Sequence, residues 1–181
     1  MFPGEFDQDA HAQRCGRGFM RLPPALRSKA TGPWTCAVYV RPFVPNDIPA
    51  IATLVRDALR ENYPMSIYLD IHRWWRDGFL VADFEGHPIG FLAAIVPGDG
   101  QARVLMLAVA TGYRSRGIGT ALMHAFMQGC ESRGLRRIEL EVRVSNQEAI
   151  HFYQRFGFAI THTLPRFYTD GEDGYKMIRI T

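Results

Sequence analysis

The stretch YRSRGIGT, residues Tyr113 to Thr120, decides the fold because it stands between a strand-like run and a helix-like run. The preceding VLMLAVA is apolar throughout, as expected for a central strand that is covered on both faces. The following ALMHAFMQGC continues the spacing of an amphipathic helix, which Gly134 is expected to end. The stretch is therefore predicted to be a glycine-bearing turn from a buried strand into a helix.

Such a turn has a chemical use. It directs unpaired backbone N–H groups at one spot, and the helix dipole adds partial positive charge there. Gly117 and Gly119 lack the side chains that would keep a pyrophosphate from the backbone. Arg114 and Arg116 can add charge-assisted hydrogen bonds of about 1.5–3 kcal/mol each. The turn is therefore predicted to bind a diphosphate.

Two common phosphate motifs do not fit this turn. A P-loop requires lysine after the second glycine, where this chain has Ile118. A dinucleotide fingerprint requires glycine three residues after Gly119, where this chain has Leu122. A diphosphate carrier of another kind is indicated.

The composition is that of a soluble globular protein with one domain. The chain has 181 residues, of which 47% are hydrophobic and 22% charged. A net charge of only +3 argues against a protein that works by neutralising nucleic-acid phosphates. No apolar run approaches the roughly 18 residues of a membrane span, so no membrane partner is expected.

The cysteines and histidines show neither disulfide-framework nor metal-ligand spacing. We therefore expect a cytoplasmic protein that needs no metal. Residues 1–36 are rich in glycine and proline and are predicted to be a loosely ordered extension. Residues 37–181 give the order β-α-α-β-β-β-α-β-α-β-β, which predicts an α/β domain whose mixed sheet is sandwiched by helices.

Two motifs in this order resemble the GNAT N-acetyltransferases. Arg114-x-x-Gly117-x-Gly119 resembles the Q/R-x-x-G-x-G/A loop that holds coenzyme A in that family. The segment LEVRVSNQEAIHFYQRFGF resembles its second signature, through Asn146, Tyr153 and the final Gly-Phe pair. The resemblance covers about residues 37–181. It implies a mixed, mostly antiparallel sheet of six to seven strands with splayed central strands and about four flanking helices, and acetyl-CoA as the cofactor.

Three shorter segments narrow the resemblance to the protein N-terminal acetyltransferases, including the RimI-like ribosomal-protein enzymes. They are ENYP at 61–64, LEVR at 140–143 and FYTDGEDGYKM at 167–177. The resemblance implies transfer of an acetyl group to the α-amino group of a protein N-terminus, with ribosomal proteins or the ribosome as one option for the partner. The chain departs from the pattern at Thr111-Gly112, where a proline or acidic residue is more usual.

The resemblance also implies the residues of the site. Those expected to bind the cofactor are Leu107, Val109, Arg114, Ser115, Arg116, Gly117, Ile118, Gly119, Thr120 and Asn146. Those expected to bind the peptide are Glu61, Tyr63, Pro64 and Tyr168. The backbone N–H groups of Leu107 and Val109 are expected to stabilise the oxyanion. Whether Glu61 orients the amine or only ends a helix is open.

Acetyl transfer also needs a neutral amine and a proton for the departing thiolate. An α-amine needs only about 1 kcal/mol to be neutral at pH 7, whereas a lysine needs roughly 4–5 kcal/mol. We expect Glu141 to act as the base, directly or through water, and Tyr153 as the acid. Glu139, two residues away, is expected to face solvent.

Two alternatives share much of this pattern. One is an acetyltransferase of small amines or lysine side chains. The other is a non-catalytic module that binds acyl-CoA, against which the presence of both Glu141 and Tyr153 argues.

Overall fold

The computed structural model describes residues 20–21, 38–98 and 100–180. The extension predicted for residues 1–36 lies outside the described residues, apart from Met20 and Arg21. In the described part of the chain, no helix is both long and apolar enough to cross a membrane.

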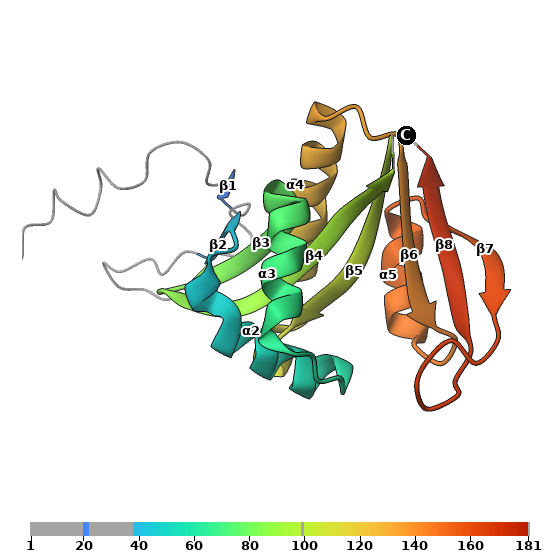
Figure 1. The fold of residues 1–181 in the computed structure, drawn as a ribbon, viewed down its shortest axis with the longest axis horizontal. Helices are drawn as coiled ribbons and strands as arrows, with labels where there is room; N and C mark the ends of the chain where they lie inside the picture. The colour runs from blue at the N-terminus through green and yellow to red at the C-terminus, as the bar shows by residue number, and fades with distance from the viewer. Residues whose placement is uncertain (1–19, 22–37, 99, 181) are drawn as a thin grey trace, which may run out of the picture.

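The elements follow the predicted order (Figure 1). The strands are β1 (Met20–Arg21), β2 (Val38–Pro42), β3 (Phe79–Phe84), β4 (His87–Gly98), β5 (Gln101–Val109), β6 (Arg137–Arg143), β7 (Ala159–Leu164) and β8 (Gly174–Ile180). The α-helices are α2 (Ile48–Leu54), α3 (Met65–Trp74), α4 (Ile118–Ser132) and α5 (Gln147–Arg155). A π-helical turn, Val55–Leu59, extends α2 and ends at Arg60 in the left-handed conformation.

The strands form one sheet in the order β1-β2-β3-β4-β5-β6-β8-β7. Within the described residues, β5 and β6 are the single parallel pair, and the other neighbours are antiparallel. Strands β2 to β8 give seven strands, within the predicted six to seven, and the two-residue β1 adds a further strand at the edge. The predicted mixed, mostly antiparallel sheet with flanking helices is confirmed.

A β-bulge in β5 lies next to the point where β5 and β6 stop pairing. The register of β4 with β5 shifts between Ala93, which pairs with Met106, and Ala94, which pairs with Val104, so Leu105 is the extra residue. A bulge bends its strand, and β5 pairs with β6 only as far as Val104. Beyond that point the strands diverge, as Figure 1 shows.

The prediction that β5 is covered on both faces along its length is wrong at the bulge. Leu105 is 36% exposed. Because the extra residue shifts the alternation, Val104 packs with α4, whereas Met106 packs with α2 and α3. One strand thus contributes to both core layers.

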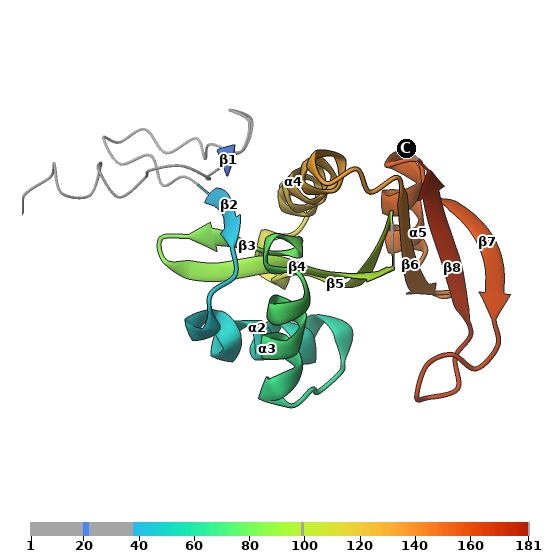
Figure 2. The ribbon, with the colours of Figure 1, turned by 45° about the horizontal axis from the view of Figure 1, so that its top comes forward.

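Two helical layers cover the sheet (Figure 2). The cluster around α2 and α3 includes Ile51, Tyr68, Phe79 and Phe91. The opposite cluster includes Leu122 and Phe126 of α4 and Ile150 of α5. Burying both faces stabilises the sheet and leaves the gap between β5 and β6 flanked by the start of α4 and by α5.

A buried ionic network joins β2 to the start of α2 and to β3. Arg41 donates from Nη1 to Asp47 Oδ2 at 2.7 Å and from Nε to Asp83 Oδ2 at 2.9 Å. The side chains of Asp47 and Asp83 are only 6% and 3% exposed. Asp83 also accepts the N–H of Gly86 at 2.7 Å, which fixes the β3–β4 turn.

Replacing Arg41 by methionine is expected to lower the free energy of unfolding by about 3 kcal/mol or more. The substitution leaves two buried carboxylates without their cation, and breaking a buried pair typically costs 3–5 kcal/mol. Urea denaturation measures the change. The control is Arg56→Met, because Arg56 is 66% exposed and pairs with Asp57 at 3.3 Å; its effect should stay within about 0.5 kcal/mol. Equal effects of the two substitutions would contradict a structural role for the network.

Candidate active site

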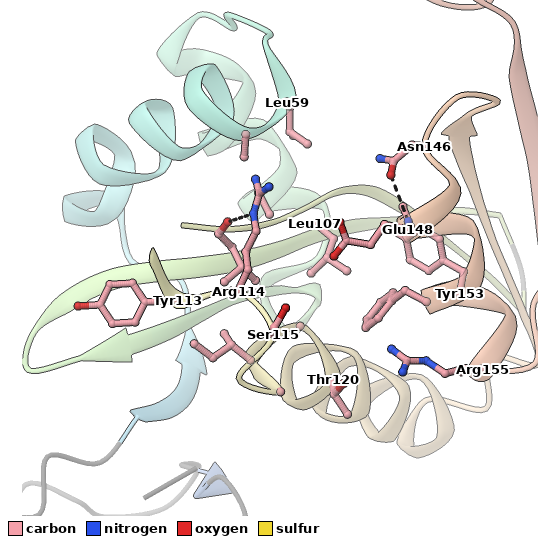
Figure 3. A pocket seen from close by; sticks show the side chains of 18 residues that line it. Leu59, Leu107, Tyr113, Arg114, Ser115, Thr120, Asn146, Glu148, Tyr153 and Arg155 are labelled. Carbon is pink, nitrogen blue, oxygen red and sulfur yellow. Dashed lines mark hydrogen bonds between the residues drawn. The ribbon is translucent and has the colours of Figure 1, made fainter. Parts of the chain in front are cut away.

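A cavity of about 560 Å³ lies where β5 and β6 diverge. Its lining comes from the π-helical turn, the end of β5, the loop that follows, the first turn of α4, and α5 (Figure 3). The lining residues are Ala58, Leu59, Leu107, Ala108, Val109, Tyr113, Arg114, Ser115, Gly117, Ile118, Gly119, Thr120, Asn146, Glu148, Ala149, Phe152, Tyr153 and Arg155. The splay of the sheet therefore creates the site.

The loop before α4 presents a row of backbone donors to this cavity. Ser115 and Gly117 have φ values of 58° and 78°, a region that glycine enters without strain. Among the described residues, no acceptor bonds the N–H groups of Ile118, Gly119 or Thr120. These donors stand at the positive end of a fifteen-residue helix, which fits the predicted anion site.

The two arginines of the loop take different positions. Arg114 lines the cavity, and its Nε donates to the carbonyl oxygen of Val109 at 3.1 Å. Arg116 does not line the cavity, and its guanidinium lies 5.6 Å from the ring centroid of Tyr113. The geometry therefore brings Arg114, rather than Arg116, to the predicted diphosphate site.

The inner end of the cavity contains backbone donors from β5. Ala110 donates its N–H to Ile89 of β4 at 2.8 Å. Because successive N–H groups of a strand point to alternate sides, those of Val109 and Leu107 point away from β4, toward the gap. This is the orientation that an oxyanion site on this strand requires.

Tyr153 and Asn146 come to the cavity from α5. Tyr153 is 8% exposed, and its pKa is raised mainly by burial and further by the neighbouring Tyr168. It thus keeps its proton throughout the neutral range. Asn146 caps α5, its side-chain oxygen accepting the N–H of Ala149 at 3.1 Å.

Three of the four predicted peptide-binding residues gather around Arg143, at the end of β6. Its Nη1 lies 2.8 Å from Asp170 Oδ2 and 2.8 Å from Glu172 Oε2, and its Nη2 lies 3.7 Å from Glu61 Oε1. The guanidinium also stacks on the ring of Tyr168, 4.0 Å from its centroid. Arg143 therefore joins the loop before α3 to the β7–β8 hairpin.

The tyrosines of this cluster lie in a partly dehydrated environment. Burial raises the pKa of Tyr168 to about 12, with Arg143 opposing and Glu141 adding to the rise. Burial likewise raises the pKa of Tyr63, and Glu61 adds to it. Pro64, the fourth predicted residue, is exposed and stands at the N-cap of α3.

The two glutamates of β6 lie differently from one another. Glu141 does not line the cavity; its carboxylate pairs with Arg103 Nη2 at 3.0 Å and is 10% exposed. The prediction that Glu139 faces solvent is wrong. Its side chain is 7% exposed because Lys176 of β8 lies 3.0 Å from its carboxylate and Arg137 lies 3.8 Å away.

Several lining residues were not predicted from the sequence. They are Ala58, Leu59, Ala108, Tyr113, Glu148, Ala149, Phe152 and Arg155. Helical spacing carries a signal for one group, since Glu148, Phe152 and Arg155 stand at i, i+4 and i+7 and so lie along one face of α5. Nothing local marks Ala58 and Leu59, which reach the cavity only through the packing of α2 on the sheet.

Comparison with known families agrees with this geometry. Residues 48–158 match the model of the acetyltransferase (GNAT) family. The chain belongs to this family. This GNAT protein is 34% identical over 143 residues to an N-alpha-acetyltransferase of Sulfurisphaera tokodaii, a match that covers 72% of the chain and 86% of the relative. The predicted resemblance to the N-terminal acetyltransferase branch is confirmed.

Solved structures share the fold of this GNAT protein. Ard1 from Thermoplasma volcanium is 38% identical with a TM-score of 0.76, and the match covers 78% of this chain and 96% of that one. A chain of the NatC complex bound to Gag peptide and CoA is 23% identical with a TM-score of 0.74, covering 80% and 98%. The latter likeness is one of fold.

Proposed function

We propose that this protein is an acyltransferase that moves the acetyl group of acetyl-CoA to the α-amino group of protein N-termini. One observation carries the proposal: a single cavity joins the donors at the start of α4 to Tyr153, whose neighbour Tyr168 belongs to the cluster around Arg143. The relative named N-alpha-acetyltransferase and the NatC structure with bound peptide and CoA support it.

The residues of the cavity fit acetyl-CoA. The unpaired N–H groups at the start of α4 and the guanidinium of Arg114 suit its diphosphate. The N–H groups of Leu107 and Val109 face the gap where a carbonyl oxygen would gain negative charge. When bound, acetyl-CoA supplies the thioester from which the acetyl group is transferred.

The remaining roles fall to side chains around the gap. The amine nitrogen forms a bond to the carbonyl carbon as the carbon–sulfur bond breaks. Burial raises the pKa of Tyr153, so its phenol is protonated throughout the neutral range and carries the proton that the departing sulfur receives. Glu141 receives the amine proton through water, since it neighbours Tyr168 but does not line the cavity. Glu61, Tyr63 and Tyr168 bind the first residues of the peptide.

The acceptor is expected to be an α-amine rather than a lysine side chain. An α-amine with a pKa near 7.7–8.0 is partly neutral at pH 7, so a weak base is sufficient. The test combines acetyl-CoA with peptides that have free N-termini, including N-termini of ribosomal proteins, and with the same peptides blocked at the α-amine but containing lysine. Mass spectrometry should find acetylation of the free peptides alone. Acetylation of the blocked peptides at the same rate would contradict the proposal.

A further inference from the structure

A shallow hollow on the surface of α5 adjoins the main cavity. Its lining residues are Glu148, His151, Phe152, Gln154 and Arg155. Glu148, Phe152 and Arg155 also line the main cavity, so the two hollows are continuous along the helix. Figure 3 shows Arg155 on the same side of Tyr153 as Thr120, in the first turn of α4. The sequence motifs assign no role to this surface.

The charges along α5 are unevenly distributed. Arg155 is exposed, and among the described residues no carboxylate lies within ion-pair distance of its guanidinium. The guanidinium lies 5.9 Å from the ring centroid of Phe152, within the range of a cation–π contact. Glu148 is seven residues earlier, about 10 Å along the axis at 1.5 Å per residue. The Arg155 end is therefore the end of the hollow that favours an anion.

The proposed positions of the thioester and the diphosphate indicate which anionic group of coenzyme A would reach Arg155. In the proposed function, the thioester lies by Tyr153 and the diphosphate lies at the start of α4. The adenosine part of coenzyme A must then extend beyond that diphosphate, and its ribose carries a phosphate monoester at the 3′ position. The guanidinium that borders both the first turn of α4 and the hollow on α5 is that of Arg155.

We propose that Arg155, supported by the ring of Phe152, binds the 3′-phosphate of coenzyme A and makes the protein prefer coenzyme A over its 3′-dephospho form. This inference rests on the proposed function. Phosphate and guanidinium form charge-assisted hydrogen bonds, and Arg155 is free to make them because no acidic group within the described residues already holds it.

The test is calorimetric titration of the full chain with CoA and with 3′-dephospho-CoA, without any acceptor peptide. We expect the wild type to bind CoA about tenfold more tightly, as the loss of one such interaction implies. Arg155→Gln should weaken CoA binding about tenfold and leave the dissociation constant of dephospho-CoA within about twofold. Arg155→Lys should restore part of the preference because it keeps the charge. The control Arg73→Gln, which alters a 75% exposed side chain of α3, should keep the wild-type ratio.

The outcomes separate this inference from the proposed function. If Arg155→Gln leaves the ratio of the two dissociation constants unchanged, Arg155 does not bind the 3′-phosphate, whereas the proposed function stands. Equal weakening of both nucleotides is one such result, and it would mean that Arg155 acts on a part that the two nucleotides share. If the wild type binds neither nucleotide, the proposed function falls and the inference falls with it.

Discussion

Gly119→Glu is expected to weaken the binding of acetyl-CoA by at least about a hundredfold. Gly119 lies in the first turn of α4, among N–H groups that have no acceptor within the described residues. A glutamate there brings a negative charge and a long side chain to the position proposed for the diphosphate. Calorimetric titration measures the affinity, and thermal unfolding should show that the fold persists, because the site faces the cavity.

The matched control at this position is Gly119→Ala. A Cβ at residue 119 would lie 3.6 Å from the ring of Phe152, which is an ordinary contact distance. Alanine also favours a helix over glycine by about 1 kcal/mol. We therefore expect less than about a tenfold loss of affinity and no loss of stability. If glutamate and alanine weaken binding equally, the anion site does not lie at the start of α4.

Tyr153→Phe is expected to lower kcat about a hundredfold while the affinity for acetyl-CoA changes by less than about twofold. The ring keeps its packing against Phe152 and Phe158, so only the hydroxyl is lost. A positioned general acid typically contributes 10²–10⁴-fold. Steady-state kinetics with a free N-terminal peptide gives kcat, and titration gives the affinity.

The pH dependence provides a second test of Tyr153. Burial raises the pKa of this phenol above its ordinary value of about 10, so its protonated form persists to higher pH than in an exposed tyrosine. The wild-type rate should therefore rise as the α-amine loses its proton near pH 8 and should not fall again before about pH 10. Tyr175→Phe, which alters a tyrosine of β8 outside the cavity lining, should leave kcat unchanged. An unchanged kcat in Tyr153→Phe would remove its role as the acid.

The substitution Glu141→Gln tests the proposed base independently of the proposed acid, Tyr153. At pH 7 most of the amine is protonated, so loss of the base should lower kcat, by about tenfold at the lower end of its usual contribution. Above pH 9 the amine is already neutral, and the variant should approach the wild type. A loss that is equal at both pH values would mean that Glu141 acts through its ion pair with Arg103 at 3.0 Å, and not as the base.

The local patterns of the chain were sufficient to predict the strands from β2 to β8 and the α-helices between them, but not β1. Helical spacing predicted the helix after Gly117, and the structure starts it at Ile118 and ends it at Ser132. Period-two alternation predicted the strand that became β6. These predictions succeed because a helix or strand depends on residues that are close in the sequence and on which of them are apolar.

The burial of individual side chains could not be predicted in the same way. Glu139 and Glu141 have the same spacing and the same charge, and both are nearly buried, yet Glu139 pairs with Lys176 of β8 whereas Glu141 pairs with Arg103 of β5. Leu105 belongs to an apolar run but is exposed, because the bulge in β5 turns it out of the layer. Both outcomes depend on partners that are distant in the sequence.

By itself, the sequence determined that a glycine-bearing turn joins a strand to a helix and can receive an anion, since the unpaired N–H groups there are a property of the local backbone. Only the tertiary structure decided that Arg114 lines the cavity while Arg116 stacks on Tyr113, and that Arg143 connects Glu61 to the β7–β8 hairpin. The reason is physical: the divergence of β5 from β6 and the packing of helices on both sheet faces set which distant side chains meet.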